Sequence, residues 1–277
     1  MRPRDLTDKL EGLEVLDGLS DRLAGAVNSA VAPVKTLLSG TWLDHPLHPA
    51  LVSTPLGCWS GAVILDLLGG EAGYAAVRPM VALGTLAALP AAITGLSDWA
   101  DSYGPERRVG LVHAAVNITG LTLFALSLGN GRRARRLRLL GLMAVGTGGY
   151  LGGHLTYARG LGVDHQILVE RPTEWTDALD AESLAEATPT LAEAGGARVL
   201  LYRRGSQIYA LSDVCPHAAG PLHEGTVDED DLCVTCPWHG SRFQLSDGRA
   251  VHGPASAPAV LYEARVRDGR VEVRVAP

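Results

Sequence analysis

The sequence predicts two domains: an all-α four-helix transmembrane bundle followed by an all-β domain built as an antiparallel β-sandwich. Two observations support this fold class. Between residues 45 and 160, four apolar stretches each have the length of about 20 residues that crosses a bilayer as a helix. Beyond residue 170, the apolar runs become short and are separated by turn residues, which is typical of strands and hairpins. A chain of 277 residues is long enough for two domains of ordinary size.

The composition agrees with a membrane protein. Hydrophobic residues make up 47% of the chain, but only two residues are Phe, and Ala, Leu, Val and Gly dominate. This mixture suits helices that pack closely in lipid. The net charge is −6, and the one dense basic run lies between two apolar stretches, so we expect no nucleic-acid partner. The first 35 residues contain no recognisable cleavable signal, so internal apolar stretches are expected to direct membrane insertion.

Residues 1–44 are predicted to form an amphipathic helical segment. Leucines and valines recur there at spacings of three or four residues, as on one face of a helix. This segment could lie on the membrane surface or pack against the rest of the protein. The four-helix transmembrane domain is expected at residues 45–160, with spans at about residues 50–69, 77–97, 109–129 and 137–158.

A soluble helical bundle is the alternative to a membrane domain. The third stretch argues against it, because His113 is its one ionisable residue and no charged face is left for water. The fourth stretch contains two glycine pairs at four-residue spacing, Gly148 with Gly152 and Gly149 with Gly153. Such pairs allow helix backbones to approach closely in lipid.

Histidines gather near one face of the predicted membrane domain. Because four crossing helices alternate in direction, His48, His113 and His154 all fall near the same membrane face. Two of them could be axial ligands of a b-type haem between the helices, or they could line a quinone site. Alternatively, they are hydrogen-bonded to backbone carbonyls, headgroups or acidic side chains, as ionisable residues near helix ends commonly are. The spacing does not decide between these possibilities.

Residues 161–172 are expected to be a linker, and residues 173–277 the β domain. Apolar residues on both sides of Arg204-Gly205-Ser206 predict a hairpin, and Asp268-Gly269 predicts another. Cys58 is isolated in an apolar stretch, where a buried and inert thiol is the usual case, so we assign it no role.

Two cysteine–histidine pairs in the β domain indicate a metal centre. Cys215 and His217 form a Cys-x-His pair, and Cys236 and His239 form a Cys-x-x-His pair 18 residues further on. A Rieske [2Fe–2S] centre uses two cysteines on one iron and two histidines on the other. A structural zinc site could use the same four residues. Zinc fingers, however, usually pair cysteine with cysteine, whereas each loop here supplies one residue of each kind.

The sequence around these pairs resembles the Rieske ferredoxin family over about residues 173–277. The resemblance is carried by CPHAAGPLHEG and by CPWHGSRFQLSDGRAVHGPASAPAVLYEARV. It implies that Cys215 and Cys236 bind one iron of a [2Fe–2S] cluster. It also implies that His217 and His239 bind the other iron, with their imidazoles toward solvent.

Further positions bear on the cluster through the same resemblance. Ser241 matches the position that can donate a hydrogen bond to a bridging sulfide, which raises the reduction potential. Phe243 stands where the high-potential respiratory members have a tyrosine. Gly220 and Trp238 replace the two cysteines that form a disulfide in those members. Both departures imply a potential at the lower end of the Rieske range. Cys233 is not at a ligand position and is expected in the strand core.

The helical region resembles a bacterial family of four-helix membrane domains of uncharacterised function, over residues 45 to about 165. The motifs that carry this resemblance are HPLHPALV, LPAAITGLSDW, GLVHAAVN and YLGGHLTYARG. The resemblance implies fold and membrane location, and it supplies no activity.

A one-electron centre without a second catalytic site predicts an electron carrier rather than a complete enzyme. The chain ends at Pro277, which leaves no room for the mononuclear-iron domain of an oxygenase. We therefore expect a membrane-anchored protein that carries single electrons between a redox donor and an acceptor protein. The alternatives are a subunit of a quinol-linked oxidoreductase with b-haem in the membrane domain, and a cluster-based redox sensor.

The expected location is the bacterial cell membrane, with several passes. Five arginines lie in the connection between the third and fourth stretches or at the very start of the fourth: Arg132, Arg133, Arg135, Arg136 and Arg138. By the positive-inside rule they favour a cytoplasmic position for that connection, which would place the β domain outside. The lack of a visible export signal favours the opposite orientation, and we expect a cytoplasmic Rieske domain.

Overall fold

The computed structural model describes residues 3–276, apart from the side chains of residues 3, 71 and 72. The chain forms two compact units. The helical unit comprises Met1–Pro33 and Leu47–Leu161, and the β unit comprises Val34–Pro46 and Gly162–Pro277. The expected N-terminal segment is thus divided between the two units, and the expected linker belongs to the β unit.

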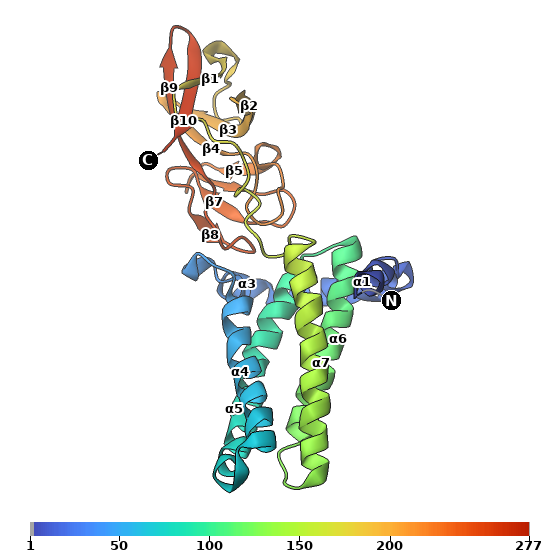
Figure 1. The fold of residues 1–277 in the computed structure, drawn as a ribbon. Helices are drawn as coiled ribbons and strands as arrows, with labels where there is room; N and C mark the ends of the chain where they lie inside the picture. Colours follow the sequence, from blue (N-terminus) through green and yellow to red (C-terminus); the bar gives the residue numbers. More distant parts are fainter. Residues whose placement is uncertain (1–2, 277) are drawn as a thin grey trace. The chain divides into compact units, whose positions relative to one another are not determined.

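Four long helices form the body of the helical unit (Figure 1). They are α4 (Leu47–Leu68), α5 (Gly70–Ala100), α6 (Gly104–Leu126) and α7 (Arg132–Tyr157). Figure 1 shows them as two antiparallel hairpins, α4 with α5 and α6 with α7. Each helix begins earlier than the apolar stretch that predicts it, because charged residues such as Arg107 and Arg132 extend the helix beyond its apolar part.

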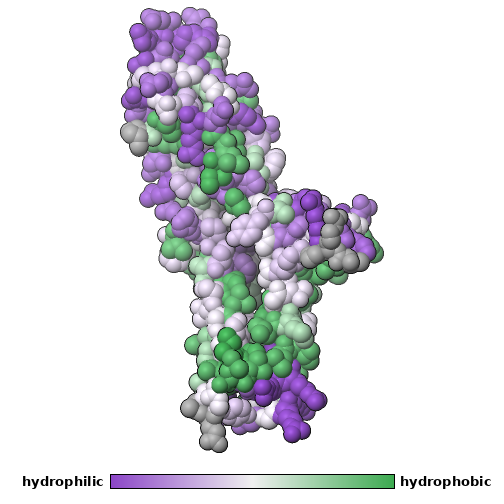
Figure 2. All heavy atoms as spheres, in the orientation of Figure 1, coloured by the Kyte–Doolittle hydropathy of each residue, from purple (hydrophilic) through white to green (hydrophobic). Residues whose placement is uncertain are grey.

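Three of these helices are long and apolar enough to cross a membrane: α4, the Gly73–Ala100 part of α5, and α6. Helix α7 is as long, but arginines occupy its first turns and glycines dilute its apolar part. Figure 2 shows hydrophobic residues over the outer surface of the long helices. These outward residues include Ile64, Leu83, Leu86, Leu89, Ile93, Ile118 and Met143. Apolar side chains that face outward from a bundle are typical of contact with lipid.

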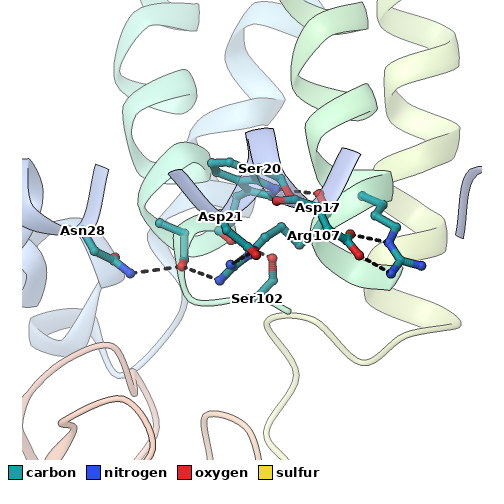
Figure 3. Close-up of polar contacts among 9 residues, drawn as sticks. Asp17, Ser20, Asp21, Asn28, Ser102 and Arg107 are labelled. Atoms are coloured by element: carbon teal, nitrogen blue, oxygen red, sulfur yellow. Dashed lines mark hydrogen bonds and ion pairs between the residues drawn. The ribbon is translucent and has the colours of Figure 1, made fainter. Parts of the chain in front are cut away.

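The predicted amphipathic segment packs on the helical unit through polar contacts. It contains α1 (Pro3–Glu11), η1 (Glu14–Leu16), α2 (Asp17–Val31) and the start of η2 (Ala32–Val34). Arg107 on α6 donates to Asp21 on α2 at 2.7 Å, and Asn28 on α2 donates to the carbonyl of Ala100 at 3.0 Å (Figure 3). Arg108 binds Asp17 through two hydrogen bonds of 2.6 Å.

The core of the helical unit repeats one packing feature in its two hairpins. Trp59 on α4 and Phe124 on α6 stack in parallel, with ring centroids 4.5 Å apart. Each ring lies against a glycine of its partner helix: a Cβ at Gly84 would lie 2.8 Å from Trp59, and a Cβ at Gly141 would lie 2.9 Å from Phe124. The two hairpins therefore bury an aromatic ring against a glycine in equivalent ways.

The β unit contains two antiparallel sheets. The six-stranded sheet has the order β1-β10-β9-β4-β3-β2, and the four-stranded sheet the order β5-β6-β7-β8. The strands are β1 (Thr176–Asp180), β2 (Thr190–Ala194), β3 (Ala197–Arg204), β4 (Gln207–Ser212), β5 (Thr226–Asp228), β6 (Cys233–Thr235), β7 (Arg242–Gln244), β8 (Ala250–His252), β9 (Leu261–Arg267) and β10 (Arg270–Val275).

The two predicted hairpins are confirmed. Strands β3 and β4 are joined through Gly205 and Ser206, and β9 and β10 through Asp268 and Gly269. Asp268 and Gly269 both have positive φ, as a two-residue type I′ turn requires. The fold class is also confirmed: a helical region with apolar helices precedes an antiparallel β domain.

Candidate metal centre

Two loops of the β unit carry the cysteine–histidine pairs, and the two loops have the same local structure. Each loop starts directly after a strand or bridge and is closed by two hydrogen bonds on its cysteine. The bonds are Cys215 N–H to Gly220 O (2.9 Å), Ala219 N–H to Cys215 O (2.9 Å), Cys236 N–H to Ser241 O (2.8 Å) and Gly240 N–H to Cys236 O (3.1 Å). The fourth residue after each cysteine has positive φ, 61° at Ala219 and 75° at Gly240. Both loops therefore present their ligands from matching tight turns.

The four predicted ligands meet as two pairs. The Nδ1 atoms of His217 and His239 lie 3.2 Å apart, and the two rings are almost perpendicular at 86°. The thiols of Cys215 and Cys236 are hydrogen-bonded to each other. In the described part of the chain, no group of three or more His, Cys, Asp or Glu side chains is arranged to bind a single metal ion. A two-iron cluster instead needs a thiolate pair at one iron and an imidazole pair at the other.

The electrostatic surroundings favour the protonation states that iron requires. Backbone N–H groups of Trp238 and His239 point at the sulfur of Cys236. The hydrogen bond from Cys215, followed by these N–H groups, lowers the pKa of Cys236 to about 6, although burial opposes the shift. The same hydrogen bond, together with burial, raises the pKa of Cys215. Donors around a thiolate stabilise its negative charge, which a cluster ligand carries.

Burial has the matching effect on the histidine pair. It lowers the pKa of His217 to about 3, and the neighbouring charges of His239, Lys35 and His165 add to the shift. The neutral imidazole is the form that binds a metal. Both histidines remain partly exposed, whereas Cys215 and Cys236 are 1% and 2% exposed. The residues present therefore fit a cluster whose cysteine end is buried and whose histidine end is nearer the surface.

The other predicted positions surround this site. Ser241 is fully buried, and its hydroxyl oxygen accepts a hydrogen bond of 2.9 Å from the backbone N–H of Ala255. Phe243 is fully buried in the same core cluster as both ligand cysteines, and its ring offers no hydroxyl to the site. Gly220 lies against Trp238 and Cys236: a Cβ there would be 3.0 Å from each.

Cys233 takes no part in the site. Its thiol donates to the side-chain oxygen of Gln244 at 3.3 Å, and burial raises its pKa to about 11. Cys58 lies in α4 and is only partly buried, so the burial expected for it is wrong.

A buried carboxylate near the cluster site was not found by sequence reasoning. Asp213 is fully buried and accepts hydrogen bonds from Arg198 at 2.6 Å and from both the backbone N–H and Nδ1 of His223 at 2.8 Å. Its charge is close enough to influence Cys236. Its position two residues before Cys215 was the available signal, but an aspartate before a loop is common and gives no indication of burial.

The three histidines of the helical unit have different surroundings. His48 binds the carbonyl of Ala91 through Nδ1 at 2.8 Å, and His113 binds the carbonyl of Gly148 through Nδ1 at 2.8 Å. The Nε2 atom of His154 instead binds the carboxylate of Glu11 at 2.7 Å. All three histidines thus take part in hydrogen bonds of the kind that the sequence analysis gave as the alternative to haem ligation.

His48 and His113 also occupy equivalent positions in the two hairpins. Each lies eleven residues before the stacked aromatic ring of its helix. Each imidazole rests against a glycine four residues beyond the carbonyl that it binds: a Cβ at Gly95 would lie 2.6 Å from His48, and a Cβ at Gly152 would lie 3.0 Å from His113. The contact of His113 with Gly152 and its hydrogen bond to the carbonyl of Gly148 place both glycines on the side of α7 that faces α6. A Cβ at Gly149, in contrast, would have nothing within 4 Å, so the first predicted glycine pair is the packed one.

Comparison with known proteins supports both halves of this description. Residues 174–270 match the Rieske [2Fe-2S] domain family, and residues 44–165 match DUF2231, a family described as predicted membrane proteins. Ferredoxin CarAc of Metapseudomonas resinovorans is 38% identical over 79 residues, which are 28% of this chain and 72% of that ferredoxin. The chain belongs to the Rieske [2Fe–2S] family.

Other Rieske proteins match the same region. The ferredoxin subunit of anthranilate 1,2-dioxygenase from Burkholderia cepacia is 32% identical over 102 residues, which are 37% of this chain and 93% of the subunit. The ferredoxin of carbazole 1,9a-dioxygenase from Nocardioides aromaticivorans IC177 has a solved structure that is 26% identical, with a TM-score of 0.35. That match covers 37% of this chain and 98% of the ferredoxin. The Rieske domain of this chain binds a [2Fe–2S] cluster, and the domain before it is a membrane domain.

Proposed function

We propose that this protein is a membrane-anchored Rieske protein that carries single electrons between a redox donor and an acceptor protein. The observation that carries the proposal is the pairing of the Cys215 and Cys236 thiols beside the pairing of the His217 and His239 imidazoles. When bound, the cluster supplies one-electron transfer. The chain's own residues hold it, neutralise the charge of its ligands and leave the histidine end nearest the surface, where electrons can enter and leave.

The relatives support a class of acceptor. Several of them are ferredoxin subunits of dioxygenases. One is the ferredoxin subunit of 3-phenylpropionate/cinnamic acid dioxygenase from Escherichia coli, which is 36% identical over 73 residues. We therefore propose an oxygenase component as the class of acceptor protein. Phe243 and the Gly220–Trp238 contact support a potential at the lower end of the roughly −150 to +300 mV Rieske range, because neither a tyrosine hydroxyl nor a disulfide is available at these positions.

The decisive experiment compares metal content and low-temperature EPR of detergent-purified full-length protein with those of two variants. Wild type should contain two irons per chain and give a rhombic Rieske signal after reduction. Cys236→Ser should lose the signal. Cys233→Ser is the matched control and should keep it, because Cys233 is bonded to Gln244 away from the ligands. If the wild type gives no EPR signal and contains zinc, the electron-carrier proposal fails. The protein would then be a membrane adaptor stabilised by zinc.

We propose that the Rieske domain lies on the cytoplasmic side of the membrane. Cys233, the one cysteine of the β unit outside the ligand set, is a free thiol, as is usual in the reducing cytoplasm. A protease added to sealed right-side-out vesicles should then leave residues beyond 170 intact, and should remove them from inverted vesicles. Cleavage in the right-side-out vesicles would instead establish the orientation that the five arginines at the start of α7 favour.

A second candidate function is a subunit of a quinol-linked oxidoreductase, with b-type haem held by His48 and His113. A carbonyl can only accept, so Nδ1 of each ring must donate to Ala91 or Gly148. This leaves Nε2 of His48 as the nitrogen available to a metal, whereas Nε2 of His113 also lies 3.3 Å from the side-chain amide nitrogen of Asn117. Haem-ligating histidines are commonly oriented in this way. The two imidazoles are also close enough to interact electrostatically.

A reduced-minus-oxidised optical spectrum tests this candidate. Haem bands in wild type should be lost in His48→Ala and in His113→Ala, and retained in His154→Ala, whose Nε2 is bound to Glu11. A wild-type spectrum without haem bands, together with an intact cluster signal, would leave only the simple electron carrier.

A further inference from the structure

A short segment from ahead of the membrane helices forms part of the β unit. Residues Val34–Pro46 contain α3 (Lys35–Ser39) and η3 (Thr41–Leu43), and both elements contact β8. We call these residues the 34–46 segment. The segment lies outside residues 174–270, which match the Rieske family. It is therefore an addition of this chain to the family's domain.

The segment is bound to the loop that follows β8. The hydroxyl of Thr41 donates to the carbonyl of Ala255 at 2.9 Å, and the two residues are 5% and 1% exposed. The backbone N–H of Gly253 donates to the hydroxyl of Thr36 at 3.4 Å. A Cβ at Gly253 would lie 3.0 Å from the hydroxyl of Ser39 and 3.2 Å from that of Thr41. A larger residue than glycine at this position would crowd the 34–46 segment.

The same loop reaches the cluster site through Ser241. The backbone N–H of Ala255 donates to the hydroxyl oxygen of Ser241, which is completely buried. Because that oxygen accepts, its own hydrogen remains available as a donor. In the Rieske family the corresponding hydroxyl can donate to a bridging sulfide. Ser241 also closes the second ligand loop, since its carbonyl accepts from the backbone N–H of Cys236.

We propose that Thr41 is a positioning residue of the cluster site: its bond to Ala255 holds the backbone N–H that orients the Ser241 hydroxyl toward the cluster. The proposal rests on the proposed function, because it requires the bound cluster. A hydrogen bond to a cluster sulfur raises the reduction potential. Loss of the Thr41 bond therefore loosens Ala255, weakens the bond from Ser241 and lowers the potential.

Two neighbouring contacts support a role for added segments at this end of the β unit. The backbone N–H of His165 donates at 3.1 Å to the carbonyl of Pro216, which lies between the ligands Cys215 and His217. His165 also lies outside the Rieske-matched residues, at the end of the region that matches DUF2231. Lys35 of the 34–46 segment is buried and its charge reaches His217. Each ligand-bearing region is thus connected to residues that the family's domain does not contain.

The test is a redox titration, followed by EPR, of full-length wild type, Thr41→Val, Thr41→Ser, Ser241→Ala and the double variant Thr41→Val/Ser241→Ala. Thr41→Val should lower the midpoint potential, and Thr41→Ser should restore it, because the serine keeps the donor. Ser241→Ala should lower the potential further. Adding Thr41→Val to Ser241→Ala should then change nothing, since Thr41 acts through Ser241.

Two results would overturn the proposal while leaving the proposed function intact: an unchanged potential in Thr41→Val with a normal wild-type signal, or additive shifts in the double variant. If the wild type gave no Rieske signal, both the positioning role of Thr41 and the proposed function would be overturned. Hydrogen exchange gives a readout independent of the cluster. The backbone N–H of Ala255 should exchange faster in Thr41→Val than in Thr41→Ser, and equal rates would count against the positioning role.

Discussion

The guanidinium of Arg138 on α7 lies 2.8 Å from the carboxylate of Asp66 on α4, and the two side chains are only 2% and 3% exposed. Arg138 also donates to the carbonyl of Ser127 at 2.7 Å. Removing the acid from such a buried pair leaves an uncompensated charge. Asp66→Ala should therefore destabilise the detergent-solubilised protein by about 3–5 kcal/mol.

Thermal unfolding of the purified protein measures this effect. The exposed Arg135 is the control on the same helix, and Arg135→Ala should change stability by less than about 0.5 kcal/mol. Replacing both members of the pair, as in Asp66→Leu/Arg138→Met, should recover much of the loss. If the double variant is as unstable as Asp66→Ala, the packing of the two side chains, rather than the balance of their charges, stabilises the protein.

Asp213 should hold the cluster potential down. Its buried negative charge lies near Cys236 and disfavours the added electron. Asp213→Asn should raise the midpoint potential by up to about 60 mV, the equivalent of roughly tenfold in a one-electron equilibrium. Asp268→Asn makes the same charge change at an exposed hairpin turn and should leave the potential unchanged. A fall in the Asp213→Asn potential would mean that loosening of the loop outweighs the charge.

Two adjacent glycines on α7 should respond in opposite ways to alanine. A Cβ at Gly148 would lie 2.4 Å from the side-chain amide of Asn117, whereas a Cβ at Gly149 would have nothing within 4 Å. Gly148→Ala should cost about 1–3 kcal/mol of stability through overpacking. Gly149→Ala should be neutral or stabilising by up to about 1 kcal/mol, because alanine favours helix. Equal melting temperatures in detergent would contradict the packing described for α6 and α7.

The pH dependence of the β unit should include a contribution from the pair between Asp177 on β1 and Arg270 on β10. Two hydrogen bonds, of 2.8 and 2.7 Å, join them, and Arg270 lowers the pKa of Asp177. Since the folded pKa is below the unfolded one, the pair stabilises the fold at pH values above the unfolded pKa. This stabilisation is lost as the pH falls through the folded pKa.

The measurement is urea unfolding of wild type and Asp177→Asn at a series of pH values from 7 to 3. The unfolded fraction is read by mass spectrometry of deuterium-labelled peptides from β1 and β10. Wild type should be the more stable at pH 7, and the difference should narrow as the pH falls toward 3. A difference that stays constant over this range would exclude the titration of Asp177 as its source.

The cluster loops could be predicted from the sequence because they are local. Cys215 and His217 are separated by one residue and are presented by a single tight turn, so spacing alone carries most of the information. Cys236 and His239 are likewise presented by a single turn, the one that joins β6 to β7. The expected position of Cys233 in the strand core is confirmed, since it lies buried in β6.

The contacts that sequence reasoning missed join distant positions. Thr41 and Ala255 are 214 positions apart, and nothing near Thr41 resembles a metal-site motif. The amphipathic pattern of residues 1–44 is continuous, so it gives no sign that the chain passes from one unit to the other after Pro33. The histidines show a related limit. The sequence predicts a common depth for them, but it could not show that His154 binds Glu11 whereas His48 and His113 bind backbone carbonyls.

The two units are interleaved along the chain, and this constrains the order of biosynthesis. Thr41 emerges from the ribosome before α4, whereas its partner Ala255 emerges long after α7. The 34–46 segment must therefore wait, without its partner loop, while all four long helices are made. Contacts between such distant positions form late and slowly. Completion of the cluster-binding unit thus follows synthesis of the helices.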